Sequence, residues 1–262
     1  MYAVEGNVEF SGKRSEHYKM ALSLYPNVWK QDLGCMRKFL RPAEGERILE
    51  VGAGCGYFSL ELARAVGPQG RVIVTDPSDE QVAPLLETPA DNIDVFREAA
   101  DELSFSIEKC DAVWSRGAFH HVRDKKSALD RLRRYAKDDG RLVIYDIFAG
   151  QRTAQYFDAF VARSCCTGHE VSYFSVEYAT TLCEMTGWGK PQFTEVTVPW
   201  EFEDTQQIGH FLSLLHAVTD GYSENDCLAA AEEHLGISTT SSGYALMWPM
   251  MVMSARSRKM DG

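Results

Sequence analysis

The segment Glu50–Gly56 carries the residues most suggestive of ligand chemistry, an acid followed by glycines in the spacing G-x-G-x-G. A glycine-rich turn between a strand and a helix lets a ligand approach the backbone closely and lie near the helix N-terminus. The dinucleotide fingerprint G-x-G-x-x-G needs a small residue at position 57, which is Tyr57 here. The loop therefore predicts a nucleotide-like ligand and disfavours a nicotinamide dinucleotide. A turn that binds nothing is the alternative interpretation.

Further polar positions follow the predicted strands that come after this loop. Asp76 closes a strand 20 residues beyond the last glycine, where a carboxylate can accept both hydroxyls of a ribose, although it could also cap a helix. The pair Ala100–Asp101 follows the next strand, where an acid can accept a hydrogen bond from an adenine amino group. Glu98 and Glu102 are close competitors for that role. Ser115–Arg116 ends a fourth strand and is expected at the mouth of the same crevice.

Short apolar runs alternate with helical patterns between residues 45 and 150. Strands of the buried type are expected at 47–51, 71–76, 93–96, 110–115 and 141–148. Helices are expected at 57–66, 79–87 and 124–137. This alternation predicts the α/β class, with a doubly wound, mostly parallel sheet that carries helices on both faces.

The remainder of the chain is expected to add mainly helices to this sheet. Residues 1–44 predict an N-terminal helical lid, which Pro26 interrupts because proline lacks a backbone donor. Farther on, helices are expected at 152–165 and 175–186, a strand at 192–202, a helical insertion at 204–235 and the last strand at 244–253. Pro249 predicts a bulge in that last strand. Because no linker or repeat is visible, residues 1–262 are predicted to form a single domain.

Composition narrows the classes of function. The 262 residues carry 27 Lys and Arg against 38 Asp and Glu, a net charge of −11, and are 45% hydrophobic. An acidic chain disfavours general nucleic-acid binding, and the basic stretch 123–141 is expected to be a solvated helix face. The sequence has no run of eighteen apolar residues, so no membrane-spanning helix is predicted. Seven cysteines without a CxxC pair predict free thiols in a reducing, cytoplasmic setting.

Together, these residues resemble class I S-adenosylmethionine-dependent methyltransferases over residues 45–150. The matching stretches are Glu50–Gly56, Gly67–Val72 leading to Asp76, Ala100–Asp101, Cys110–Val113 and Asp138–Leu142. Phe119–Val122 and Thr186–Trp188 are similar to small-molecule methyltransferases of the ubiquinone/menaquinone-biosynthesis type. The resemblance implies a Rossmann-like, seven-stranded sheet with residues 45–150 as the cofactor-binding core. Asp138–Gly140 departs from the lysine-proline-glycine type of turn usual in the family, which affects a loop and not the chemistry.

The resemblance implies S-adenosyl-L-methionine as the cofactor and assigns roles around it. The three glycines would let the backbone meet the methionine portion, and Glu50 would orient the loop or the ammonium group. Asp76 would bind the ribose and Asp101 the adenine. The predicted cofactor-contacting residues are Tyr18, Glu50, Gly52, Gly54, Gly56, Asp76, Ala100, Asp101 and Ser115.

The end of the fourth strand bears on the acceptor. Methyl transfer from a sulfonium is an in-line displacement, so the protein must mainly align nucleophile, carbon and sulfur. The stretch Ser115–Phe119 shows neither the Asn/Asp-Pro-Pro-Tyr/Phe motif of amino-methylating enzymes nor the Pro-Cys of cytosine C5 enzymes. We therefore expect a small-molecule acceptor, which the aromatic N-terminal segment suggests is aromatic or heteroaromatic, and leave a carbon, nitrogen or oxygen target open.

His120, His121 and His169 are the candidate bases, needed only if the acceptor is protonated, and His120 and His169 are the predicted catalytic pair. The alternative for His120 and His121 is a hydrogen-bonded histidine that opens the next helix, and the alternative for His169 is a surface-loop residue. Tyr25, Trp29 and Arg116 are predicted to bind the acceptor, with plain core packing as the alternative for the two aromatic residues. No set of His, Cys and carboxylate residues has metal-ligand spacing along the chain, so no metal is predicted.

The sequence thus predicts a methyltransferase that acts on a small molecule, with no nucleic-acid or membrane partner. A homodimer stays open. Two other functions also stay open: a nicotinamide-dependent oxidoreductase, and a non-catalytic binding protein that keeps the fold.

Overall fold

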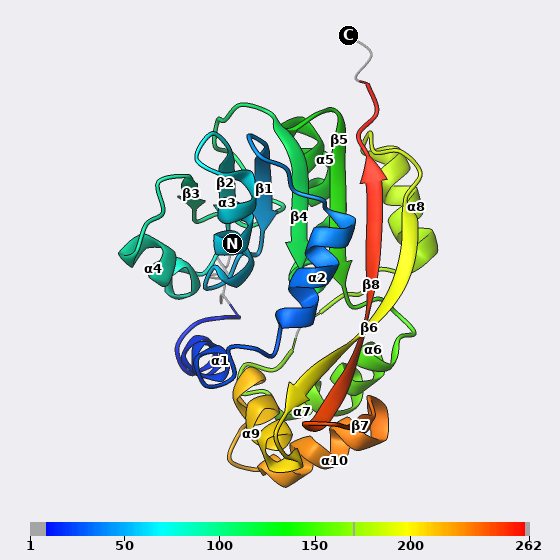
Figure 1. Cartoon of the computed structure of the whole chain (residues 1–262). Helices are drawn as coiled ribbons and strands as arrows, with labels where there is room; N and C mark the ends of the chain where they lie inside the picture. Colours follow the sequence, from blue (N-terminus) through cyan, green and yellow to red (C-terminus); the bar gives the residue numbers. More distant parts are fainter. Residues whose placement is uncertain (1–8, 170, 260–262) are drawn as a thin grey trace, which may run out of the picture.

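The computed structural model describes residues 9–169 and 171–259, and an eight-stranded sheet runs through them. The strands are β1 (Arg47–Val51), β2 (Arg71–Thr75), β3 (Ile93–Phe96), β4 (Cys110–Arg116), β5 (Ala136–Asp146), β6 (Gln192–Phe202), β7 (Ile237–Thr240) and β8 (Gly243–Arg256). Their order is β3-β2-β1-β4-β5-β8-β6, and β7 pairs with β8 (Figure 1). The first five strands are parallel, and β8 is antiparallel to its neighbours β5, β6 and β7. The doubly wound, mostly parallel fold is confirmed, with one strand more than the expected seven.

Helices flank the sheet. They are α1 (Lys13–Leu24), α2 (Lys30–Phe39), α3 (Tyr57–Val66), α4 (Asp79–Glu87), α5 (Lys125–Tyr135), α6 (Arg152–Tyr156), α7 (Ala162–Ser164), α8 (Val176–Met185), α9 (Thr205–Leu215) and α10 (Glu224–His234). A π-helical turn, Phe157–Val161, joins α6 to α7. Side-chain caps begin several of these helices, as at Ser78 before α4 and in the capping box of Ser223 and Asp226 before α10.

The order of the strands creates a crevice in the middle of the sheet. From β1 the chain passes to β2 and β3 on one side, and then to β4 and β5 on the other. The loops that leave the carboxyl ends of β1 and β4 therefore diverge, which is the place where ligands bind in open α/β sheets. Apolar side chains bury β1, β2 and β4 on both faces, so these strands form a rigid floor for the crevice.

The last strands differ from the prediction at two points. The chain forms an additional strand, β7, directly before β8. The bulge expected at Pro249 is wrong, because the register between β6 and β8 continues through the pair Thr197 and Pro249 without a shift. Pairing of β8 with β5 reaches only to Met251, and pairing with β7 reaches only to Leu246. Pro249 lies between these limits, where the missing N–H interrupts no ladder on that side.

The region that was predicted as an insertion contains α9 and α10, which lie together beneath the extended ends of β6 and β8 (Figure 1). In the parts of the chain that the structure describes, no helix has the length and apolar character needed to cross a membrane.

Candidate active site

A cavity of about 640 Å³ opens at the carboxyl ends of β1, β2 and β4. This volume lies in the range that small-molecule sites occupy. What we call the glycine-loop end is lined by Gly52, Gly54, Asp76, Gln81, Ala100 and Asp101. What we call the aromatic end is lined by Trp29, Arg116, Phe157, Trp200, Trp248 and the histidines His120, His121, His169 and His216. Tyr18 lines the cavity too, and its ring reaches both Gly54 and Trp29.

At the glycine-loop end, the carboxylate of Asp76 is held in place by the backbone. The N–H of Gly54 donates to Oδ2 at 2.9 Å, and the N–H of Ser78 donates to Oδ1 at 2.9 Å. Burial raises the pKa of Asp76, while these two hydrogen bonds act in the opposite direction. Asp101 lines the same end and accepts the backbone N–H of Asp124 at 3.1 Å. Both acids therefore stand where the sequence placed them, with lone pairs left for ligand donors.

Gly52 and Gly56 must both lack a side chain, but for different steric reasons. A Cβ on Gly52 would lie 2.2 Å from the Cβ of Ala118, so this turn depends on close approach to the loop after β4. A Cβ on Gly56 would lie 2.4 Å from Leu85, where α3 packs against α4. Gly56 is outside the cavity lining in the described chain, and it serves helix packing. Both residues have positive φ, which favours glycine.

Glu50 and Ser115 lie behind the loop and do not line the cavity in the described chain. The hydroxyl of Ser59 on α3 donates to Oε2 of Glu50 at 2.5 Å, and burial raises the pKa of Glu50 to about 8. The hydroxyl of Ser115 donates to the carbonyl of Val51 at 2.9 Å. In this structure, both residues support the loop from below.

An unpartnered polar atom indicates where a ligand fits. Oε1 of Gln81 is buried without a hydrogen-bond partner and lies 3.7 Å from the position of a Cβ on Gly54. Its amide nitrogen donates to Ser15 Oγ at 3.0 Å, which fixes the orientation of the amide. A buried acceptor without a donor is costly unless a ligand supplies one. The residues of this end therefore fit a ligand that carries N–H or O–H groups, as S-adenosylmethionine does.

The aromatic end is a stack of large rings around one cation. The rings of Trp200 and Trp248 are parallel within 14° at 4.2 Å, because β6 and β8 pair side by side. The guanidinium of Arg116 lies 4.4 Å from the ring centre of Trp29 and bonds Asp32 Oδ1 at 2.8 Å. Such flat, partly charged walls suit a planar acceptor.

Tyr25, predicted to bind the acceptor, is not among the residues that line the cavity in the described chain. It follows the end of α1, and its hydroxyl lies 2.8 Å from Nδ1 of His210 on α9. Its ring packs against Phe202 and Phe211. The aromatic residue at this position therefore joins α1 to α9, whereas Trp29 does reach the cavity.

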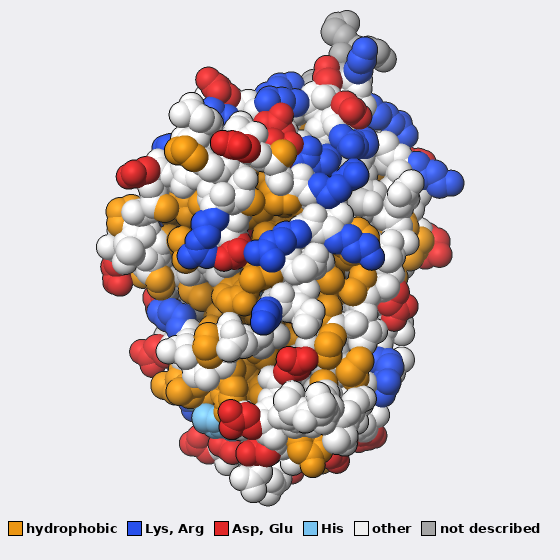
Figure 2. All heavy atoms as spheres, in the orientation of Figure 1, with side chains coloured by type: hydrophobic (Ala, Val, Ile, Leu, Met, Phe, Trp, Pro, Cys, Tyr) orange, Lys and Arg blue, Asp and Glu red, His pale blue; other side chains and the backbone are white. Residues whose placement is uncertain are grey.

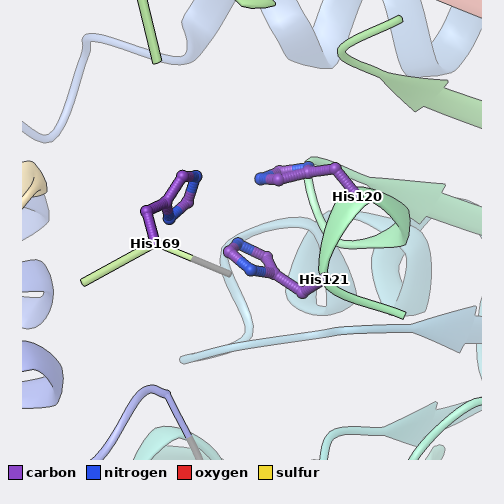
Figure 3. Close-up of side chains that lie close together, drawn as sticks. All are labelled: His120, His121 and His169. Atoms are coloured by element: carbon purple, nitrogen blue, oxygen red, sulfur yellow. The ribbon is translucent and has the colours of Figure 1, made fainter. Parts of the chain in front are cut away.

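The histidines His120, His121 and His169 converge at one side of the cavity, as Figure 3 shows. Nδ1 of His120 lies 2.6 Å from Oδ1 of Asp146, which ends β5. Nδ1 of His121 lies 2.6 Å from Glu9, and Nδ1 of His169 lies 3.0 Å from the same carboxylate. Two carboxylates therefore hold three rings, which we call the histidine cluster.

The protonation of the histidine cluster follows from its burial. Burial lowers the pKa of His121 to about 4 and also lowers the pKa of His169. Burial opposes ionisation of Glu9 as well, but hydrogen bonds from the two rings hold its pKa below the ordinary value. The rings of His121 and His169 are thus neutral at pH 7, beside an ionised carboxylate.

Sequence reasoning missed several cavity residues. They are Glu9, Arg14, Gln81, Trp200, His216 and Trp248. No local pattern marks these residues, since they come from elements that meet only through the tertiary fold.

Comparisons with known proteins agree with this geometry. The family model described as a methyltransferase domain matches residues 48–140. The uncharacterized methyltransferase YcgJ of Bacillus subtilis is 29% identical over 120 residues, 45% of this chain and 47% of the relative. The ubiquinone/menaquinone biosynthesis C-methyltransferase UbiE of Pasteurella multocida is 29% identical over 127 residues, 45% of each protein. The chain thus spans about half the length of these curated relatives.

Solved structures share the fold over most of the chain. The crystal structure of YcgJ from Bacillus subtilis aligns with a TM-score of 0.60 and 19% identity, and covers 88% of this chain and 100% of its own. Phosphoethanolamine N-methyltransferase 2 of Haemonchus contortus, in complex with S-adenosyl-L-methionine, has a TM-score of 0.64 and 14% identity over 97% of this chain and 59% of its own. The glycine loop and Asp76 thus lie within the methyltransferase domain that the family model matches, residues 48–140.

Proposed function

We propose that this protein transfers the methyl group of S-adenosylmethionine to a small aromatic or heteroaromatic acceptor bound at the aromatic end of the cavity. One observation carries the proposal: the same cavity joins the glycine-loop end to a wall of three tryptophans. The cofactor and the acceptor would therefore bind next to each other in one continuous cavity. Alignment of the two reactants is what an in-line displacement mainly requires.

The residues divide the work between the two ends. Gly52, Gly54 and Asp76 would hold the cofactor, with Asp101 toward its adenine. The bound cofactor supplies an electrophilic methyl group. At the other end the faces of Trp29 and Trp248 would position a planar acceptor.

The histidine cluster faces the acceptor's reacting end, so the acceptor would give up its proton there as the new bond to the methyl group forms. His120 and His169, the candidate catalytic residues, both line the aromatic end. The ring of Phe157 packs against both imidazoles, at 5.9 Å from His120 and 4.8 Å from His169. This aromatic contact shields the imidazoles from bulk water, so electrostatic interactions with them are stronger than in water.

Glu9 and Phe10, which precede α1, line the cavity. We propose that they belong to the lid predicted over residues 1–44, of which 1–8 lie outside the described residues. Glu9 contacts the histidine cluster, and the carbonyl of Phe10 accepts the hydroxyl of Ser78 at 2.5 Å. The N–H of Gly12 donates to the carboxylate of Glu80 at 2.9 Å. These contacts tie the lid to α4 and to the histidines, which would exclude water during transfer.

A small-molecule acceptor also suits the surface. Figure 2 shows acidic side chains among the Lys and Arg side chains of this face. Within the basic stretch 123–141, Arg133 pairs with Asp138 at 3.0 Å and Arg134 with Asp130 at 2.6 Å. Paired cations are poor phosphate ligands, so we propose no nucleic-acid partner. All seven cysteines are free, which supports a reducing, cytoplasmic location.

The test is incubation of the protein with methyl-labelled S-adenosylmethionine and a cell extract, followed by separation of metabolites, protein and nucleic acid. We expect label in the metabolite fraction, and a loss of about 100-fold for Trp248→Ala, since truncation of a buried aromatic anchor costs several kcal/mol. Leu86→Ala, on an exposed side chain of α4, is the matched control and should leave transfer unchanged. Label in the protein or nucleic-acid fraction, or none at all, would overturn the proposal.

A further inference from the structure

We propose that His120, His121 and His169 bind a divalent first-row transition-metal ion at the aromatic end of the cavity. The ligand atoms of the three rings lie within 4.8 Å of one another, a grouping that no spacing in the sequence announces. Imidazole nitrogen is a ligand that zinc, iron, copper and nickel all accept. The site is distinct from the residues that fit the cofactor, since it lies among the aromatic rings.

The backbone presents the three rings from two directions. His120 and His121 are consecutive residues of the 3-10 turn Phe119–His121, which follows β4. His169 comes from the loop after α7, and its ring centre lies 5.9 Å from that of His120 and 5.1 Å from that of His121. Figure 3 shows nitrogens of the three rings directed toward a common space. Nitrogens bound tetrahedrally to one ion at about 2.1 Å stand about 3.4 Å apart, so the side chains would rotate slightly from the present spacing when the ion binds.

The carboxylates behind the rings have the arrangement of a metal site's outer shell. Nδ1 of His120 lies against Asp146, and Nδ1 of both His121 and His169 lies against Glu9. Because these contacts use Nδ1, Nε2 is the nitrogen of each ring that would bind the ion. Metal-bound histidines usually bond their other nitrogen to a carboxylate in this way. Nε2 of His169 is buried without a hydrogen-bond partner, and the side chain is only 1% exposed.

The charges around the histidine cluster favour a cation. The carboxylates of Glu9 and Asp146 lie against the three rings, and the guanidinium of Arg14, which also lines the cavity, opposes them in part. Two carboxylates behind three convergent imidazoles make a site that attracts a cation. A divalent cation would balance the charge of the two carboxylates and give Nε2 of His169 the partner that it lacks.

Three protein ligands leave coordination positions open toward the cavity, as in catalytic metal sites. An oxygen or nitrogen donor of the acceptor would fill one of them. With an ion bound, the imidazoles would act as ligands and not as bases; coordination would lower the pKa of the bound donor group, whose proton would pass to solvent water before the methyl group is transferred. This role of the metal rests on the proposed methyl transfer, whereas metal binding itself does not.

The experiment is calorimetric titration of the chelator-treated protein, free of any histidine tag, with Zn²⁺ and, anaerobically, with Fe²⁺. We expect one ion per chain, and a loss of affinity on the order of 100-fold for His169→Ala and for His121→Ala. His234→Ala, on α10, removes a histidine outside the cluster and should bind metal as the native chain does. Glu9→Gln keeps all three ligands and should weaken binding about 10-fold.

Binding of S-adenosylhomocysteine by each variant reports whether the fold is intact, because its residues lie at the other end of the cavity. Stoichiometric metal binding that the cluster variants leave unchanged would overturn the inference, as would no metal binding by a native chain that binds S-adenosylhomocysteine. If the metal-free protein transfers label at the full native rate, the metal's role falls and the methyltransferase proposal stands. Metal binding without any transfer would sink the methyltransferase proposal alone.

Discussion

Nη2 of Arg116, at the end of β4, lies 2.8 Å from Oδ1 of Asp32 on α2, and both side chains are buried. The second oxygen of Asp32 accepts the indole N–H of Trp200 at 3.0 Å. One carboxylate from the N-terminal region therefore holds both a cation and a tryptophan of the cavity wall. Asp32 thus links α2 to both β4 and β6.

Asp32→Asn should destabilise the protein strongly. The substitution removes the negative charge and leaves the guanidinium of Arg116 buried without a counterion, which costs about 3–5 kcal/mol. Urea unfolding measures the effect. Asp220→Asn, which removes the partner of Lys13 in an exposed pair, is the matched control and should change stability by less than about 1 kcal/mol. Equal losses in the free energy of unfolding for the two substitutions would show that the buried pair stabilises the protein no more than the exposed pair does.

Gly52→Ala should weaken cofactor binding as well as stability. Its Cβ would clash with Ala118, and its φ of 69° adds backbone strain. Gly45→Ala has a φ of 79° but meets no atom within 4 Å, so it carries the strain alone, about 1 kcal/mol. We expect S-adenosylhomocysteine affinity to fall about 10-fold or more for Gly52→Ala only. Unchanged affinity would mean that the turn does not shape the site.

Asp76→Asn should lower affinity for S-adenosylhomocysteine by about 10- to 100-fold. A hydrogen bond to a charged group contributes about 1.5–3 kcal/mol, and the amide cannot accept from ligand and backbone as the carboxylate does. Calorimetry gives the dissociation constants. Asp79→Asn, three residues farther on α4, alters an exposed pair with Arg97 and should leave binding as it is. Affinity within threefold of native for Asp76→Asn would contradict the assigned role.

Glu50→Gln should remove a pH dependence of stability. The folded pKa of Glu50, about 8, lies above its ordinary value because the carboxyl is buried. The folded state therefore holds this proton more tightly, and its contribution is complete below about pH 4.5 and lost as pH rises through 8. Between pH 5 and pH 9 the native chain should lose roughly 3–5 kcal/mol relative to Glu50→Gln. A difference that is constant with pH would place the carboxylate in contact with solvent.

Local signals explain what the sequence could reveal. The loop Glu50–Gly56 and Asp76 stand at strand ends, where residue type and position are tied to the chain's own geometry, and both meet at the cavity. The bounds of β3, α3 and α4 agree with the ranges expected from apolar periodicity. The bulge predicted at Pro249 was wrong because a proline disrupts a sheet only where its missing N–H would have bonded a neighbouring strand. At Pro249, β8 pairs with β6 but no longer with β5.

The remainder of the site depends on contacts between distant segments. His121 and His169 are 48 residues apart, and Glu9 joins them from a third place in the chain. Trp200 and Trp248 stack only because β6 and β8 pair. The periodicity of the sequence shows which residues face the interior. It does not show which of them line the same side of the cavity.

The most direct test of the central claim is a crystal structure of the protein with S-adenosylhomocysteine, with Gly54→Arg as a control that fills the cavity. The account predicts that the ribose contacts Asp76 and the adenine lies beside Asp101. It also predicts that the sulfur faces the aromatic end, and that Gly54→Arg no longer binds the ligand. A ligand bound outside this cavity, or one that Gly54→Arg binds equally well, would contradict it.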